Sequence, residues 1–198
     1  MVNSTCLAGL WRHDVLNGLL WYAPQIGSRS GTYVAPSWSW TSSHGRVAHG
    51  TGVGGDVLVE VVSARTGTIK PDPLGGVANG AIVLRGRVDP CRLRLVKKAG
   101  NLSRCSLALI HGAEEGYTLT GTAREQERIS PSDRPIICSC WFDVEQNLER
   151  YLWIICITER YGLILRQRED VWERVGLIRS PLLMKKGSDQ DLTTVTIV

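Results

Sequence analysis

Residues 151–179 read YLWIICITERYGLILRQREDVWERVGLIR and carry the clearest signal for the fold. Two runs rich in apolar and β-branched residues are separated by a turn predicted at Tyr161-Gly162, and a third run, WERVGLIR, follows. This spacing predicts a β-hairpin with a third strand that continues the meander. The terminal LTTVTIV, residues 192–198, predicts one more strand.

The chain before this meander shows the same pattern of short apolar runs between turns. Its 21 glycines, in segments such as DPLGGVANG, favour many turns over a helix bundle. Strands are predicted at 57–65, 81–88, 92–97, 105–110, 117–121 and 136–142, and the polar stretch 123–135 is predicted to be an exposed loop. About ten strands in all predict an antiparallel β-barrel or sandwich.

The first 22 residues differ from this pattern. In TCLAGLWRHDVLNGLLWY, residues 5–22, apolar side chains recur every three or four positions, and Pro24 follows. This periodicity predicts one amphipathic α-helix packed on the β-rich part. The fold class expected is therefore mainly β, an antiparallel barrel or sandwich with one N-terminal helix, in a single domain 1–198 whose β-rich barrel spans 33–198.

Two tryptophans lie two residues apart in APSWSWTSSHG, residues 35–45. In an extended strand from Tyr33 to Thr41, Trp38 and Trp40 would share one face and the serines between them the other. The paired indoles are either core residues between sheet and helix or one wall of a small-molecule pocket. Both interpretations remain open from the sequence.

If a pocket lies beside these indoles, further side chains are candidates for it. His44 follows the tryptophan pair closely and is a candidate catalytic hydrogen-bond donor, as is the hydroxyl of Tyr22. The expected substrate-binding walls are Trp21, Tyr33, Trp38 and Trp40.

Several functional classes are disfavoured by the motifs that the sequence lacks. GTGVGGD, residues 50–56, has no GK[ST] and precedes a strand, so a phosphate loop is not expected. Nucleophile elbows, CxxC pairs, zinc-like histidine spacing and dinucleotide fingerprints are absent from the sequence. We therefore expect neither a cofactor nor a metal. The formal charge of +4 comes from scattered basic residues, which does not favour a nucleic-acid partner.

The sequence also bears on location. An N-terminal signal peptide is not predicted, because charged residues interrupt the first apolar stretch, and no run of 18 apolar residues predicts a membrane span. The six cysteines lie far apart except Cys138 and Cys140, which would share one face of a strand. Reduced, mostly buried thiols and a cytoplasmic location are expected.

Several blocks, in order, carry a likeness to a known family: LAGLWRHDVLNGLLWY, APSWSWTSSHG, DPLGGVANGAIVLRGRV, YGLIL, WERVGLI and TVTIV. Together they resemble the C-terminal region of fungal heterokaryon-incompatibility (HET) proteins over nearly the whole chain. In typical members an N-terminal HET domain precedes this region, whereas here Met1 opens directly onto it. Members usually have an aspartate where this chain has His44. The resemblance implies no catalytic residue that can be carried over.

Two functions are consistent with these features. The first is a cofactor-independent cyclase of Diels–Alder type, acting on a hydrophobic fungal metabolite such as a terpenoid or polyketide. Such a step needs only a shaped aromatic pocket and hydrogen-bond donors, with no nucleophile or metal. The second, which the resemblance implies, is a non-catalytic module that recognises a ligand or a protein, with loops 42–56 and 123–135 as contact surface.

Overall fold

The structure is a computed structural model. It describes residues 5–25, 27–50, 52, 55–69, 76–99, 102–109, 136–144, 152–179 and 192–198. The predicted strand at 117–121 and the predicted loop at 123–135 lie outside these residues. In the described part the chain is mainly β, with one short α-helix, and the expected fold class is confirmed.

The N-terminal segment consists of short elements, and longer strands follow it. The short elements are β1 (Cys6–Leu7), β2 (Leu10–Trp11), η1 (Arg12–Asp14), α1 (Val15–Gly18), β3 (Trp21–Tyr22), η2 (Trp40–Ser42) and β4 (Ala48–His49). The longer strands are β5 (Glu60–Thr68), β6 (Val77–Gly86), β7 (Val88–Ala99), β8 (Leu102–Leu109), β9 (Ile136–Phe142), β10 (Leu152–Cys156), β11 (Tyr161–Arg168), β12 (Val171–Arg179) and β13 (Thr193–Ile197).

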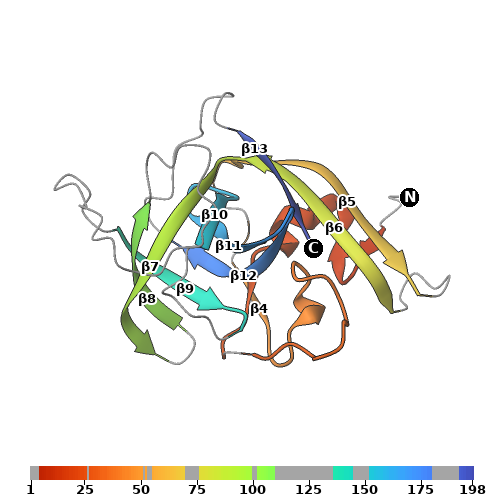
Figure 1. The fold of residues 1–198 in the computed structure, drawn as a ribbon, viewed down its shortest axis with the longest axis horizontal. Coiled ribbons are helices and arrows are strands. Elements are labelled where there is room, and N and C mark those ends of the chain that lie inside the picture. Colours follow the sequence, from red (N-terminus) through yellow and green to blue (C-terminus); the bar gives the residue numbers. More distant parts are fainter. Residues whose placement is uncertain are drawn as a thin grey trace.

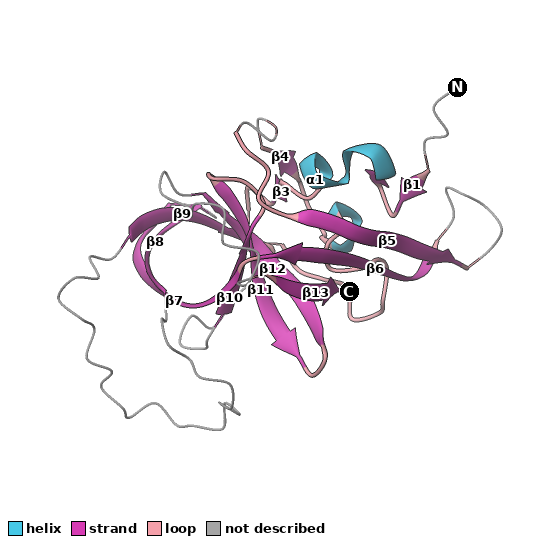
Figure 2. Ribbon diagram, turned by 90° about the horizontal axis from the view of Figure 1, so that it is seen from above, coloured by secondary structure: helices cyan, strands magenta, loops and turns pink. Residues whose placement is uncertain are grey.

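The longer strands form one nine-stranded sheet in the order β11-β10-β7-β8-β9-β12-β13-β6-β5. Neighbours are antiparallel except β12 and β13, which run parallel. Because β12 also pairs with β11, the strands β11, β10, β7, β8, β9 and β12 are paired in a ring. Figure 2 shows β7 to β10 curving around this ring. The sheet as a whole stays open, since within the described residues β5 pairs only with β6.

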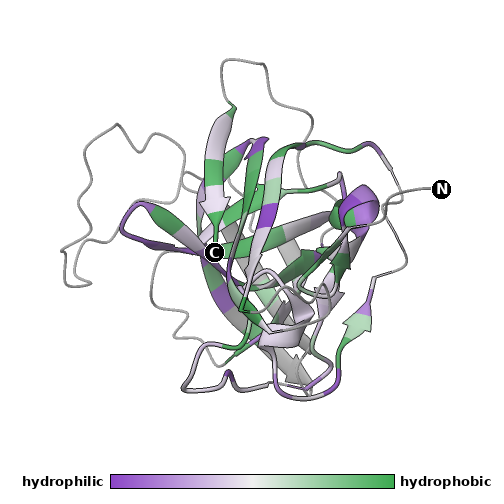
Figure 3. Ribbon diagram, turned by 90° about the vertical axis from the view of Figure 1, so that its right-hand side faces the viewer, coloured by the Kyte–Doolittle hydropathy of each residue, from purple (hydrophilic) through white to green (hydrophobic). Residues whose placement is uncertain are grey.

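Two hydrophobic cores follow from this arrangement. Every buried member of the smaller core comes from the six strands of the ring, among them Cys91, Leu152 and Ile178. The larger core joins β5, β6, β11, β12 and β13 to the N-terminal segment, which lies against this half of the sheet in Figure 1. Figure 3 shows hydrophobic and hydrophilic residues alternating along several strands, as expected where one face of each strand packs on a core.

The predicted helix over residues 5–22 is wrong. Residues 6–11 form a hairpin instead, because Ala8 (φ 48°) and Gly9 (φ 87°) adopt the left-handed conformation of a tight two-residue turn. Only α1 is α-helical, as a single turn that ends at Gly18, and the 3-10 turn η1 precedes it. The apolar residues that suggested a helical stripe are nevertheless buried, including Leu7, Leu10 and Leu19, because the whole segment lies over the sheet.

The predicted strand from Tyr33 to Thr41 is also wrong. The Ser39 side chain accepts a hydrogen bond from the backbone N–H of Thr41 at 3.0 Å and turns the chain into η2. Backbone bonds from Ser39 N–H to Pro36 O (3.0 Å) and from Ser42 N–H to Ser39 O (3.1 Å) complete the turns. Trp38 and Trp40 therefore do not form one face of a strand.

The C-terminal meander is confirmed with one shift in a turn. The chain turns at residues 157–160 and β11 already begins at Tyr161, whereas the prediction placed the turn at Tyr161-Gly162. Thr158 explains the shift, because its hydroxyl accepts hydrogen bonds from the backbone N–H groups of Arg160 (3.2 Å) and Tyr161 (3.1 Å).

A buried arginine connects the N-terminal segment to the sheet. Arg174 of β12 is 0% exposed and donates to Asp143 Oδ2 at 3.1 Å and to the backbone oxygens of Leu19 and Trp21. Its guanidinium carbon lies 3.7 Å from the centroid of the Trp21 ring. A β-bulge at Val175 places both residue 174 and residue 175 in the interior.

Candidate functional site

The structure does not bring the predicted site residues together around one hollow. Trp21 and Trp38 are both 0% exposed, and neither lines either of the two grooves described below. The Trp21 indole donates to the backbone oxygen of Trp38 at 2.9 Å, and the Trp38 ring belongs to the larger core. These two indoles are therefore core residues by position.

The other four predicted residues lie in separate places. Trp40 is half-buried and donates from Nε1 to Gly9 O at 3.0 Å. Tyr22 packs on Trp141, with ring centroids 5.0 Å apart, and His44 is exposed where its backbone pairs with Ser28. Tyr33 is 56% exposed and lines a groove.

This groove, called the Arg29 groove below, has a volume of 390 Å³ and opens to solvent. Its walls are residues of the loop from Arg29 to Ser37 together with Ser42, Asn79 and Gly80 of β6, Arg168 and Glu173 of the β11–β12 hairpin, and Val198. The volume lies within the range of roughly 300–1,000 Å³ that is typical of ligand pockets. Apolar side chains and a few convergent polar groups line it, which is also typical of such pockets.

Three arginines converge on one carboxylate at this groove. Glu173 accepts from Arg29 through Oε1, and from Arg166 (2.7 and 3.1 Å) and Arg168 (3.2 Å) through Oε2. Arg29 also donates to the backbone oxygen of Arg174 at 2.6 Å, so the buried anchor and the groove share a wall. Both carboxylate oxygens are thus engaged, and Glu173 is not a free base.

The electrostatics keep Glu173 ionised. Desolvation alone would raise the pKa of Glu173, but the hydrogen bonds and positive charges of Arg166, Arg29 and Arg168 outweigh it and hold the pKa below its ordinary value. Partial burial raises the pKa of Tyr33, so its phenol keeps its proton and is a hydrogen-bond donor at neutral pH.

Glu173→Gln is expected to lower the free energy of unfolding at neutral pH by about 1.5–3 kcal/mol, the range for hydrogen bonds to a charged group. Because the folded-state pKa is depressed, this stabilisation is fully present above the ordinary value of 4.5 and is lost as pH falls through the lower folded-state pKa. Urea unfolding followed from about pH 7 to about pH 3 should therefore show wild type and variant converging in acid.

Glu60→Gln is the matched control for this prediction. The Glu60 side chain is 65% exposed and lies 3.9 Å from Arg85, so its loss should change stability by less than about 0.5 kcal/mol at any of these pH values. A constant difference between Glu173→Gln and wild type across the acid range would show that the charge of Glu173 is not what stabilises the fold.

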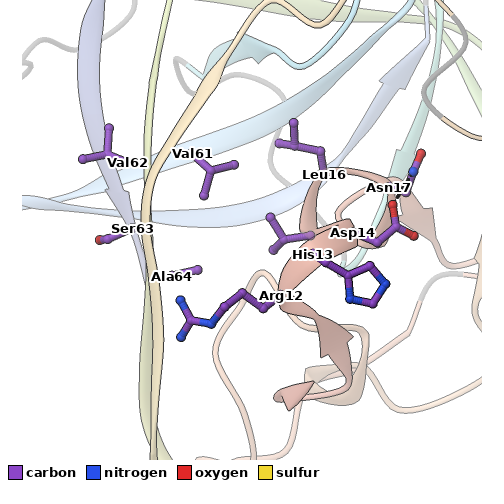
Figure 4. A pocket seen from close by; sticks show the side chains of 10 residues that line it. Arg12, His13, Asp14, Leu16, Asn17, Val61, Val62, Ser63 and Ala64 are labelled. Carbon is purple, nitrogen blue, oxygen red and sulfur yellow. Dashed lines mark hydrogen bonds between the residues drawn. The ribbon is translucent and has the colours of Figure 1, made fainter. Parts of the chain in front are cut away.

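A second groove, of 490 Å³, lies between residues 12–17 and residues 61–64 of β5. Figure 4 shows Arg12 extending from the N-terminal segment towards β5, with Asp14 and Asn17 on the side away from the strand. Arg12 is exposed, and no second arginine or lysine is among the described residues that line this groove. The Arg29 groove, with its cluster of charged groups, is therefore the better candidate site.

The cysteines provide no activated nucleophile at either groove. All six are free thiols, as predicted, and the five other than Cys6 are buried. Cys138 and Cys140 lie on one face of β9 with their sulfurs 3.7 Å apart. Desolvation raises the pKa of Cys156 to about 12. Among the described residues, no three His, Cys, Asp or Glu side chains come close enough to hold a metal ion.

Sequence reasoning did not identify Arg29, Arg168 or Glu173 as site residues. Arg29 and Glu173 are 144 positions apart, so no local motif joins them. A partial signal exists, because a turn at Glu169-Asp170 would set Arg166 opposite Glu173 on the hairpin, and the two are partners in the observed register.

Comparisons with known proteins add no further assignment: no family model, curated protein or solved structure matched the chain. None of the helices in the described part of the chain has the length and apolar character that crossing a bilayer requires.

Proposed function

We propose that this chain is a non-catalytic recognition module that binds a small organic ligand in the Arg29 groove. The observation that carries the proposal is the convergence of Arg29, Arg168 and Tyr33 on one groove of ligand size. The resemblance to the C-terminal region of HET proteins supports this choice, since what the family name implies is recognition.

The chemistry of the groove supports binding without turnover. Glu173 is the one carboxylate side chain among the described residues that line the groove. It is held ionised by three guanidinium groups, and both of its oxygens are engaged in hydrogen bonds, so it is a poor proton acceptor for a substrate. The hydroxyl of Ser37 is engaged too, since it donates to Val198 O and accepts from the Arg174 N–H at 2.9 Å. The remaining groups, such as Tyr33 and Asn79, are suited to orienting a ligand.

The proposal is tested with a fragment library and nitrogen-15-labelled full-length protein. We expect some fragments to shift the backbone amide signals of residues 29–35 and of Asn79 and Gly80. Thr32→Trp places a large ring at the mouth of the groove from an exposed position and should abolish these shifts. Thr193→Trp, an equal change at an exposed site at the far end of β13, should leave them intact.

Two results would overturn the proposal. One is a library without any fragment that shifts these amides. The other is binding that survives Thr32→Trp unchanged, which would locate the ligand elsewhere.

The cofactor-free cyclase is the second candidate, because Tyr33 and two guanidinium groups give this groove donors that could polarise a carbonyl. The expected aromatic walls Trp21 and Trp38 do not contribute to it. Incubating the protein with candidate polyenes separates the two functions. A change in the rate or ratio of cyclised products favours the cyclase, whereas binding with unchanged products favours the recognition module.

A further inference from the structure

We infer that the ligand of the Arg29 groove is an organic anion, a carboxylate attached to an apolar body. The inference rests on the proposed function and names the ligand class for the same groove. It is argued from the balance of charge at the groove, from its unused donors and from its apolar wall.

The balance of charge is positive. Among the side chains of described residues that line the groove, Arg29 and Arg168 carry two positive charges against the one negative charge of Glu173. Arg166 binds Glu173 as well, from outside the lining. Glu169 and Asp170 at the hairpin turn are exposed and do not line the groove, so water screens them. An entering anion would therefore meet a net positive site in a partly desolvated place, where charge–charge attraction is stronger than in bulk water.

The groove also has hydrogen-bond donors that no acceptor of the described residues uses. Arg29 Nε is buried and has no partner among the described residues. The Arg168 side chain is 58% exposed and makes one bond to Glu173, which leaves most of its donors facing water or a ligand. Guanidinium groups bind carboxylates and phosphates with charge-assisted bonds, so an anionic group is the natural partner for this surplus.

The apolar wall selects among anions. Tyr33 and Val34 are 56% and 47% exposed, and together with Ala35 and Val198 they line the groove beside the arginines. A bare phosphate ion would leave these side chains in water, whereas an aromatic or aliphatic body would cover them. The combination points to an amphipathic organic acid.

The test compares three probes by titration at low ionic strength: phenylacetate, its neutral amide phenylacetamide, and inorganic phosphate. We expect phenylacetate to bind roughly tenfold more tightly than either of the others, the effect of one charge-assisted hydrogen bond or of an apolar contact. Arg168→Gln should weaken phenylacetate roughly tenfold. Arg94→Gln, an equal charge change at an exposed site on β7, should not.

Glu173→Gln provides a change of opposite sign. The Glu173 carboxylate competes with a bound carboxylate for the N–H donors of the arginines. Without its charge these donors are available to the ligand, so phenylacetate should bind more tightly to this variant than to wild type. If the substitutions acted only by disturbing the structure of the groove, Glu173→Gln and Arg168→Gln would both bind phenylacetate more weakly than wild type.

Each contrary outcome has a defined meaning. If phenylacetamide binds as tightly as phenylacetate and Thr32→Trp abolishes both, the recognition function holds and the anion inference is overturned. If phosphate binds as tightly as phenylacetate, the apolar body is not recognised and the inference is likewise overturned. If none of the three probes binds and the fragment library is also silent, the proposed function fails with it.

Discussion

Arg174→Met is expected to lower the free energy of unfolding by about 3–5 kcal/mol, the range for breaking a buried ion pair by removing one partner. Asp143 is 0% exposed and would lose its counter-ion, so its carboxyl group would have to stay charged in the interior or take up a proton, and both cost stability. The backbone oxygens of Leu19 and Trp21 would also lose their donor. Equilibrium urea unfolding, followed by tryptophan fluorescence, measures the loss.

The mechanism predicts partial recovery in a double variant. Burial raises the pKa of Asp143 and lowers that of Arg174, because desolvation penalises both charges, while their mutual attraction opposes both shifts. Arg174→Met with Asp143→Asn removes the stranded charge and should be more stable than Arg174→Met alone. It should remain less stable than wild type, because the two backbone oxygens stay without a donor.

Arg94→Met is the control, since Arg94 is exposed on β7 and its replacement should change stability by no more than about 0.5 kcal/mol. A loss of under about 1 kcal/mol in Arg174→Met, or a double variant no more stable than the single one, would contradict the role of Arg174 as the anchor of the N-terminal segment.

The strands were predictable because their signals are local. Residues 136–142 and 172–179 alternate or form apolar runs between turns, and the structure places β9 and β12 there. A strand needs only a repeat of two and a flanking turn to be recognised in a sequence. The fold class followed from the number of such segments.

The N-terminal segment was not predictable by the same reasoning. The spacings of three from Leu7 to Leu10 and from Leu16 to Leu19 fit a helical stripe. A hairpin that folds back, however, also buries Leu7 and Leu10 on one side. The deciding feature is the positive φ of Ala8, and alanine gives no local signal for it. Contact with the sheet overrode helical propensity.

The candidate site depends on long-range contacts that no motif records. Arg29 is polar, lies in a loop and resembles any solvated arginine in the sequence. It becomes a site residue only because β12 brings Glu173 and the backbone oxygen of Arg174 beside it. Tyr33 was named from the sequence and does line the groove, whereas Trp21 and Trp38, chosen for the same aromatic character, lie in the core.

Trp38→Ala is expected to lower the free energy of unfolding by about 3–5 kcal/mol, the range for truncating a buried large aromatic side chain. The Trp38 ring is fully buried, and a Cβ added at Gly80 would lie only 3.1 Å from it, which shows how closely β6 approaches the indole. Because the surroundings of the indole are already closely packed, they can move only a little into the cavity that the variant leaves. Urea unfolding measures the change in stability.

Trp11→Ala is the matched tryptophan control, because Trp11 is 51% exposed and stacks only on His13 among aromatic rings of the described residues. Its loss should change stability by about 0.5 kcal/mol or less. If Trp38→Ala were as mild as Trp11→Ala, the indole would have to border a void instead of a packed core. A pocket walled by Trp38 would then return as a candidate, and the Arg29 groove would lose its preference as the ligand site.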